Sequence, residues 1–261
     1  LDETEIEDGS VSLERFTDTD RDVMRYTIGF STSPVRRVTL SGHYRYENKD
    51  NAYDHEIDTL PDGYSAFIND QEMTTNALGA RLSVQPKSWV RASLGYQLVD
   101  TEIDTTFDND PSRVQSGNYD ANIYSLDVTV TPIANLFLSS FLSWQDVRGV
   151  AFDNGVNSVI AYEGDVLSSA LSARYSLDEL STVSLNYAYS FSDNFTDNSE
   201  DGLPLLQDYA FHHLEAGYSR KLTDNLQAEV TYGYYDYDAD HNNGINDYSA
   251  HLVELLLSLS L

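Results

Sequence analysis

The feature that most constrains this chain is a two-residue alternation of apolar and polar side chains near its C-terminus. Apolar or aromatic residues occupy every second position from Leu226 to Tyr234, and again from Val253 to Leu261. A period of two is typical of a β-strand with one apolar face. A soluble strand usually ends after about five or six residues, whereas a membrane-spanning strand needs about nine to eleven. The alternation therefore predicts strands that cross a membrane.

The same pattern recurs along the rest of the chain. Short turns are predicted near residues 34, 86, 132, 179 and 223, roughly 45 to 50 residues apart, with long polar stretches such as 48–72 and 104–117 predicted as loops between them. Each period holds two long strands, whereas a β-propeller blade of similar length packs four short ones. Eleven strands are predicted in this way, and Val11–Phe16 is the candidate for a twelfth because bacterial barrels usually have an even number.

The predicted fold is an all-β, up-and-down antiparallel transmembrane β-barrel of about 12 strands, with short periplasmic turns and long acidic extracellular loops. It forms a single domain over residues 1–261, with residues 1–9 expected to be disordered or periplasmic. The alternative is a soluble, secreted β-sandwich or barrel whose apolar stripe is its core. Small residues on the polar face, including Gly29, Ser41 and Gly79, favour a lumen with closely spaced walls.

Composition excludes several classes of function. The net charge of −28 and pI near 4.2 exclude nucleic-acid binding, because there is no basic stripe to neutralise phosphates. The chain has no cysteine, which excludes disulfides, thiolate metal sites and covalent attachment of c-type haem. It has no apolar run near 18 residues, as a transmembrane helix would need. Its 19 tyrosines suit the aromatic girdles of a membrane barrel.

Charged residues alternate with the apolar positions and are expected to point into the lumen. The candidate pore-lining residues are Arg25, Arg45, Arg81 and Arg91 on the early strands and Asp127, Glu215, Glu229 and Glu254 on the later ones. A basic wall facing an acidic wall would set up a transverse field that filters charged solutes. The alternative is that these charges pair with one another across a filled lumen. The sequence leaves both interpretations open.

One stretch has the spacing of a calcium loop. Asp236, Asp238 and Asp240 alternate as in an EF-hand, but His241 stands where the glycine is expected and the last ligand would be Asp247 instead of glutamate. The competing interpretation is a solvated acidic loop, which could bind Ca²⁺ loosely and bridge lipopolysaccharide. No cofactor other than this loosely bound calcium is predicted.

No enzyme activity is predicted. His43, His212, His213 and His251 have no nucleophile motif near them.

The long alternating strands, short turns and long acidic loops resemble the Gram-negative outer-membrane β-barrels, the porins among them. This resemblance implies an integral protein of the bacterial outer membrane, in contact with lipid and lipopolysaccharide, either as a homo-oligomer or with a partner. Leu261 departs from the pattern, since such barrels usually end in Phe or Trp.

A second resemblance rests on YRYENKDN at 44–51 and GYYDYDADHNNGINDYSAH at 233–251. These segments are similar to strand ends of the decahaem-cytochrome-associated outer-membrane barrels. Those barrels are much larger than this chain; they sheath a multihaem cytochrome and let electrons cross the membrane.

The leading functional hypothesis is thus a porin-like channel for passive diffusion of small polar or charged solutes. The alternative is a structural barrel that sheathes or anchors a partner such as a multihaem cytochrome in an electron conduit. A third hypothesis is a filled barrel that serves adhesion or membrane anchoring.

Overall fold

A computed structural model describes residues 2–7, 10–57, 68–107, 114–153, 156–157, 162–193, 208–239 and 247–259; side chains are described from Thr17 onward, apart from residues 55–57, 153, 156–157 and 162. These residues form one antiparallel sheet whose strands pair in sequence order, apart from the short β8, which pairs only with β7. The strands are β1 (Asp2–Glu7), β2 (Ser10–Val35), β3 (Val38–Ile57), β4 (Ile68–Lys87), β5 (Val90–Phe107), β6 (Val114–Ile133), β7 (Leu136–Asp153), β8 (Val156–Asn157), β9 (Tyr162–Ser176), β10 (Ser181–Asp193), β11 (Tyr209–Lys221), β12 (Leu226–Ala239) and β13 (Tyr248–Leu259).

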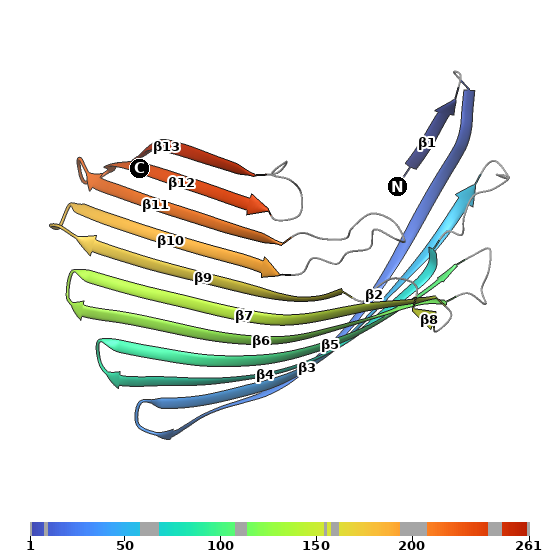
Figure 1. Cartoon of the computed structure of the whole chain (residues 1–261), viewed down its shortest axis with the longest axis horizontal. Helices are drawn as coiled ribbons and strands as arrows, with labels where there is room; N and C mark the ends of the chain where they lie inside the picture. The colour runs from blue at the N-terminus through green and yellow to red at the C-terminus, as the bar shows by residue number, and fades with distance from the viewer. Residues whose placement is uncertain are drawn as a thin grey trace.

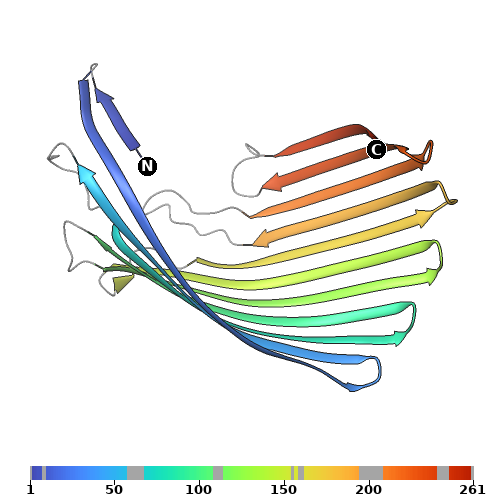
Figure 2. The same ribbon diagram turned by 180° about the vertical axis from the view of Figure 1, so that it is seen from behind.

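The sheet is strongly curved and forms a trough, with β1 and β2 along one margin and β13 along the other (Figures 1 and 2). The prediction of an all-β, up-and-down antiparallel fold is confirmed, and within the described residues the path from β1 to β13 holds twelve strands, β8 excluded. In the part of the chain that the structure describes, no helix is long and apolar enough to cross a membrane.

The five turns that join the long strands β2 to β12 in pairs lie at one end of the trough, which we call the turn rim; the other end is the loop rim. The turns at the turn rim are residues 36–37, 88–89, 134–135, 177–180 and 222–225. Backbone hydrogen bonds join the first three turn regions to the strand ends next to them: Gln85 N donates to Arg37 O at 2.8 Å, Thr131 N to Trp89 O at 2.8 Å, and Ser176 N to Asn135 O at 2.9 Å.

Three of the predicted turn positions were slightly displaced. Pro34, Pro86 and Pro132 do not form the turns; each lies inside a strand, at an irregularity in the register just before a two-residue turn. A β-bulge tolerates proline because the missing N–H is not needed there for the ladder. Arg37, the second residue of the first turn, has a positive φ of 71°.

The predicted loops 48–72 and 104–117 were too long. β3 continues to Ile57, β4 begins at Ile68, β5 continues to Phe107 and β6 begins at Val114. Within these stretches the ladder is unbroken from Asn48, opposite Thr74, to Ala52, opposite Asp70. Both faces of the strands are polar there, so the hydrophobic alternation that predicts a strand disappears although the backbone pairing continues.

The N-terminal segment also differs from expectation. Val11–Phe16 is not a separate twelfth strand, because these residues are the first part of β2, whose 26 residues extend over about 85 Å at ~3.3 Å per residue. The additional strand is β1, formed within the segment expected to be disordered or periplasmic, and it pairs with residues 10–16 of β2 at the loop rim.

The two faces of the sheet differ in chemistry and in exposure. Large apolar side chains lie exposed on one face, such as Ile28 at 72% and Leu94 at 58%. Apart from Ser181 beside a turn, the buried residues of the long strands lie on the opposite, polar face, such as Ser93 at 6% and Thr101 at 8%. Curvature crowds the side chains on the concave side, so the polar face lines the trough and the apolar face covers its outside.

Candidate functional site

The outer face carries an apolar belt that begins at the turn rim. On β5 the outward residues from Val90 to Leu98 are all apolar, and the next outward residues, Asp100 and Glu102, are charged. At ~3.3 Å per residue this belt is about 30 Å long, or about 23 Å high for a strand tilted by ~40°, close to the ~25 Å apolar band of outer-membrane barrels. The belt is therefore tall enough to span the hydrocarbon core.

Aromatic residues lie near the upper edge of the belt, which is the edge that faces the loop rim. Tyr124 stacks between Tyr96, at 5.1 Å between ring centroids, and Trp144, at 5.4 Å. Tyr96 Oη donates to Asn122 Oδ1 at 2.8 Å, and Tyr44 Oη donates to Asn76 Oδ1 at 2.6 Å. In each pair the ring lies in the belt and its hydroxyl reaches toward the polar part of the neighbouring strand. Tyrosine has this arrangement at a membrane–water interface.

The strand register places all eight predicted pore-lining residues on the concave polar face, and whether they line a pore stays a prediction. Arg25, Arg45, Arg81 and Arg91 lie on four successive strands, β2 to β5; Asp127 lies on β6, and Glu215, Glu229 and Glu254 lie on β11, β12 and β13. The basic residues and the three glutamates therefore lie on opposite sides of the trough, because β2–β5 and β11–β13 are its two flanks.

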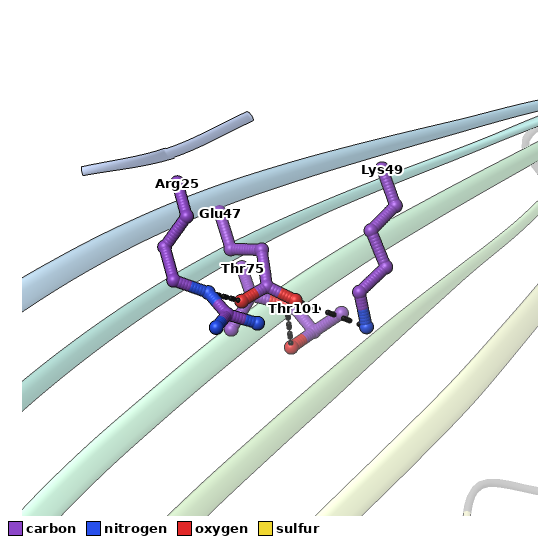
Figure 3. Close-up of polar contacts among 5 residues, drawn as sticks. All are labelled: Arg25, Glu47, Lys49, Thr75 and Thr101. Carbon is purple, nitrogen blue, oxygen red and sulfur yellow. Dashed lines mark hydrogen bonds and ion pairs between the residues drawn. The ribbon is translucent and has the colours of Figure 1, made fainter. Parts of the chain in front are cut away.

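Part of the basic wall is neutralised locally. Glu47 lies between Arg25 and Lys49: it forms an ion pair with Arg25 Nε and another with Lys49 Nζ at 3.0 Å (Figure 3). Glu47 follows Tyr46, the last outward aromatic of β3, and so lies beyond the apolar belt. Hydrogen bonds from Arg25 and Lys49 hold the pKa of the Glu47 carboxyl well below its usual range, so Glu47 is ionised at neutral pH.

A third ion pair on the polar face spans three strands. Arg81 Nη2 on β4 lies 2.9 Å from Asp127 Oδ2 on β6, although β5 runs between them. The residue of β5 opposite Arg81 is Gly95, which has no side chain to block the contact. Both charged side chains are largely exposed, so this pair is worth at most about 1 kcal/mol. Sequence reasoning assigned the two residues to opposing walls, whereas the structure pairs them.

Several other charged residues of the polar face form no ion pair within the part of the chain that the structure describes. Among the described residues, Arg45 and Arg91 form no ion pair, nor does Arg174 on β9, which the sequence reasoning missed although it alternates with the outward-facing Tyr175. Glu215 Oε1 accepts a hydrogen bond from Asn186 Nδ2 at 3.0 Å, and no ion pair is found for Glu215 among the described residues. The face therefore keeps net positive charge on one flank and net negative charge on the other.

A groove of about 660 Å³ lies over β2 to β6 and is lined in part by residues of the polar face. His43, Arg81 and Gln97 contribute its large polar side chains. The ring of His43 lies over Gly79 on the next strand, where a Cβ atom would collide with it. The other three histidines of the sequence analysis lie elsewhere: His212 and His251 contact Tyr187 and Tyr232 on the outer face, and His213 stacks on Tyr235 at 4.4 Å on the polar face.

The predicted calcium-loop residues that the structure describes lie in an extended strand and not in a loop. Asp236 and Asp238 lie within β12, opposite His212 and Ala210, and Asp240 lies outside the described residues. Alternate residues of an extended strand are about 7 Å apart, whereas an EF-hand loop folds its ligands around one ion. Within the described residues no group of three or more His, Cys, Asp or Glu side chains could hold a metal ion.

Comparisons with known proteins give similarity in structure only. No protein-family model matches the sequence, and no curated protein matches it. The porin NanC is 8% identical, with a TM-score of 0.37, and the match covers 91% of this chain and 99% of NanC. The outer-membrane channel DcaP of Acinetobacter baumannii is 10% identical, with a TM-score of 0.42 and coverage of 91% and 84%. The translocator domain of the autotransporter NalP from Neisseria meningitidis is 8% identical, with a TM-score of 0.38 and coverage of 95% and 82%.

The assignment to the membrane comes from the chain itself. Long antiparallel strands, an outward apolar belt of bilayer height, an aromatic upper edge and a polar concave face together form the wall of an outer-membrane β-barrel. The protein is thus an integral outer-membrane barrel protein in contact with lipid.

Proposed function

We propose that this chain forms the wall of a channel through which small polar or charged solutes diffuse passively across the outer membrane. The observation that carries the proposal is the difference between the two faces of the sheet. The outward face is apolar over the height of a bilayer, whereas the concave face is lined by small polar residues and by charges that water must solvate. Buried charges without partners are costly, so unpaired arginines favour a water-filled lumen.

The distribution of charge suggests how such a channel would select. Arg45 and Arg91 lie on β3 and β5, and Glu229 and Glu254 lie on β12 and β13. Charges in water are screened beyond about 8 Å at physiological ionic strength, so each flank acts mainly on solutes that pass close to it. A solute with both charges would be oriented across the lumen, and an ion would be held to one flank.

The test is single-channel recording of the purified protein in a planar bilayer, with the reversal potential measured in a salt gradient. Replacing both Arg45 and Arg91 with alanine is expected to shift the ion selectivity toward cations. Arg36→Ala is the matched control, because Arg36 lies exposed in the turn at 36–37 and outside the sheet wall. A protein that inserts but stays electrically silent contradicts the channel, as does a selectivity that responds equally to the control.

A second candidate is a structural barrel that sheathes or anchors a partner. It is favoured by the height of β2 to β7, whose polar face continues beyond the apolar belt through Lys49, Gln71 and Thr105. These strands offer a deep polar surface that a channel does not need. Electrical silence combined with a partner that co-purifies in a fixed ratio, recognised by haem absorbance if it is a cytochrome, would support the sheath over the channel.

A further inference from the structure

Positive charge is concentrated at one part of the turn rim. The hairpin of β2 and β3 carries Arg36 and Arg37 in its turn, and the neighbouring hairpin of β4 and β5 carries Lys87 beside its turn (Figure 1). All three side chains are exposed. The segments 23–46 and 73–99 form the turn-rim halves of these four strands and contain no Asp or Glu, although the whole chain has 43. The three cations therefore have no carboxylate within their own hairpin halves.

Two contacts fix the positions of these three cations, which we call the basic patch. Arg37 Nη1 donates to Pro86 O of the neighbouring hairpin at 2.7 Å, which brings the guanidinium close to Lys87. The other guanidinium N–H groups remain available to an oxyanion. Lys87 Nζ lies 5.2 Å from the centroid of the Trp89 ring, a distance at which the ring face attracts a cation. An anion placed between Arg37 and Lys87 would relieve the repulsion between their like charges.

The basic patch lies at the height of the lipid headgroups. On β3 the first outward residue of the apolar belt is Val38, which directly follows Arg37. On β5 it is Val90, which directly follows Trp89. Trp89 is 40% exposed, and tryptophan is enriched at the membrane–water interface. The anions present at this end of the belt are the phosphates of membrane lipids.

An apolar groove of about 630 Å³ lies over the same strands, β2 to β5, and most of its lining residues belong to the outer face. The strand register places one row of outward residues across it: Phe30, Gly42, Ala80 and Tyr96. The two small residues leave room between the two rings, and the ring of Phe30 lies over Gly42, where a Cβ atom would collide with it. The volume is within the ~300–1,000 Å³ of small-molecule sites. Since the groove lies in the apolar belt, the molecule that contacts it there is an acyl chain.

We propose that the basic patch and this groove together bind one glycerophospholipid with an anionic headgroup. Its phosphate lies at Arg36, Arg37 and Lys87, and one of its acyl chains lies along β3 and β4 over Gly42 and Ala80. Gly42 is five residues beyond Arg37, which is ~17 Å along the strand and ~13 Å in depth for a strand tilted by ~40°. One leaflet of the hydrocarbon core is about 15 Å thick, so a single lipid reaches both features. The inference goes beyond the proposed channel and does not depend on it, because it concerns only the face toward the membrane.

The charges elsewhere on the protein disfavour other positions for this headgroup. Toward the loop rim, the outward residues beyond the belt include Asp100 and Glu102, which repel phosphate. On the other flank of the turn rim, the turn at 177–180 contains Asp178 and Glu179. Free phosphate could contact the basic patch but would gain nothing from the groove. An anionic phospholipid is the occupant that uses both features.

Native mass spectrometry of the purified protein in detergent tests the proposal. Phosphatidylglycerol, which is anionic, and phosphatidylethanolamine, which has no net charge, are offered in equal amounts with identical acyl chains, and one phosphatidylglycerol is expected to remain bound. Arg37→Asn combined with Lys87→Gln is expected to raise its dissociation constant about 25-fold, since each basic residue near an anionic lipid surface contributes about fivefold. Asparagine tolerates the positive φ at position 37. The matched control is Arg174→Gln combined with Lys221→Gln, which removes the same charge from the other flank of the turn rim.

The groove is tested separately by Ala80→Leu, which fills its floor and keeps the belt uncharged and apolar. This variant is expected to weaken the binding of phosphatidylglycerol severalfold. Ala216→Leu, on the outer face of β11 and away from the groove, is the matched control and is expected to leave the binding unchanged.

Equal retention of the two phospholipids, or an equal loss of binding in the charge control, would overturn the proposal. An unchanged affinity in Ala80→Leu, or displacement of the lipid by an excess of inorganic phosphate, would likewise overturn it, because the patch would then bind phosphate without the groove. Retention of lipopolysaccharide in place of phosphatidylglycerol, when both are offered, would contradict the assignment to a phospholipid. Electrical silence in a planar bilayer contradicts only the channel, so the two proposals fail in different experiments.

Discussion

An arginine placed on the outer face should destabilise the protein in a way that depends on depth in the bilayer. Leu94 is 58% exposed and lies midway along the belt of β5, opposite Leu82 and Leu126. Arginine at the midplane of a membrane barrel costs about 2–4 kcal/mol, whereas near the interface it costs about 0–1 kcal/mol. Leu94→Arg is therefore expected to lower the free energy of unfolding by about 2–4 kcal/mol, and Leu98→Arg, beside the charged Asp100, by less than about 1 kcal/mol.

The matched control is Gln97→Arg on the same strand. Gln97 lies on the polar face in the 660 Å³ groove, which has room for a longer side chain, so little change in stability is expected. The assay is reversible urea unfolding of the protein folded into lipid vesicles, followed by tryptophan fluorescence. Equal losses for Leu94→Arg and Leu98→Arg would refute the reasoning, because the core of a soluble protein has no such depth dependence. An equal loss for Gln97→Arg would refute the assignment of the faces.

Four further outcomes are expected. Trp144 lies on the outer face, so its fluorescence in the Trp89→Phe variant should be quenched by lipids brominated on their acyl chains, and unchanged fluorescence would place it away from lipid. Asp127→Asn should free Arg81 and shift the channel's ion selectivity toward anions, as measured by reversal potential. Tyr96→Phe should cost about 0.5–1.5 kcal/mol in vesicle unfolding, because it removes the hydrogen bond to Asn122. Arg37→Val should lower the urea midpoint more than Arg37→Gly does, since a β-branched residue at positive φ is strained by about 1–3 kcal/mol.

The fold could be predicted from the sequence where contact with lipid requires apolar side chains on the outer face. The alternation over Val90–Leu98 reports the apolar belt, and it predicted the strand, its outer face and the inward direction of Arg91. Beyond the belt water meets both faces, so Asp100 and Glu102 gave no sign that β5 continues to Phe107. The alternation also did not predict the β-bulges at Pro34, Pro86 and Pro132. Because of these bulges, the three turns lie a few residues beyond their prolines.

The candidate site was predictable to a smaller extent. Alternation assigns a residue to a face, and it placed Arg81 and Asp127 correctly on the polar one. Alternation does not determine which residues of different strands are in contact, because that depends on the strand register. The register places Gly95 opposite Arg81, so that Arg81 can reach across β5 to Asp127. The pair between Glu47 and Arg25 was hidden for the same reason, since 22 residues separate them in the sequence.

The order of the strands has a consequence for how the wall forms. Every pairing among the described strands joins neighbours along the sequence, apart from the minor β8, so each hairpin can close before the next is made. Contacts between nearby residues carry a small loop-closure entropy and form quickly, whereas contacts between distant residues form slowly. β2 and β13 lie near the two ends of the described path, so a pairing that closes the wall at their edges must wait for the strands between them. Assembly of this protein should accordingly proceed as a fast, stepwise lengthening of the sheet, followed by one slow closing event whose rate falls when the edges of β2 or β13 are blocked.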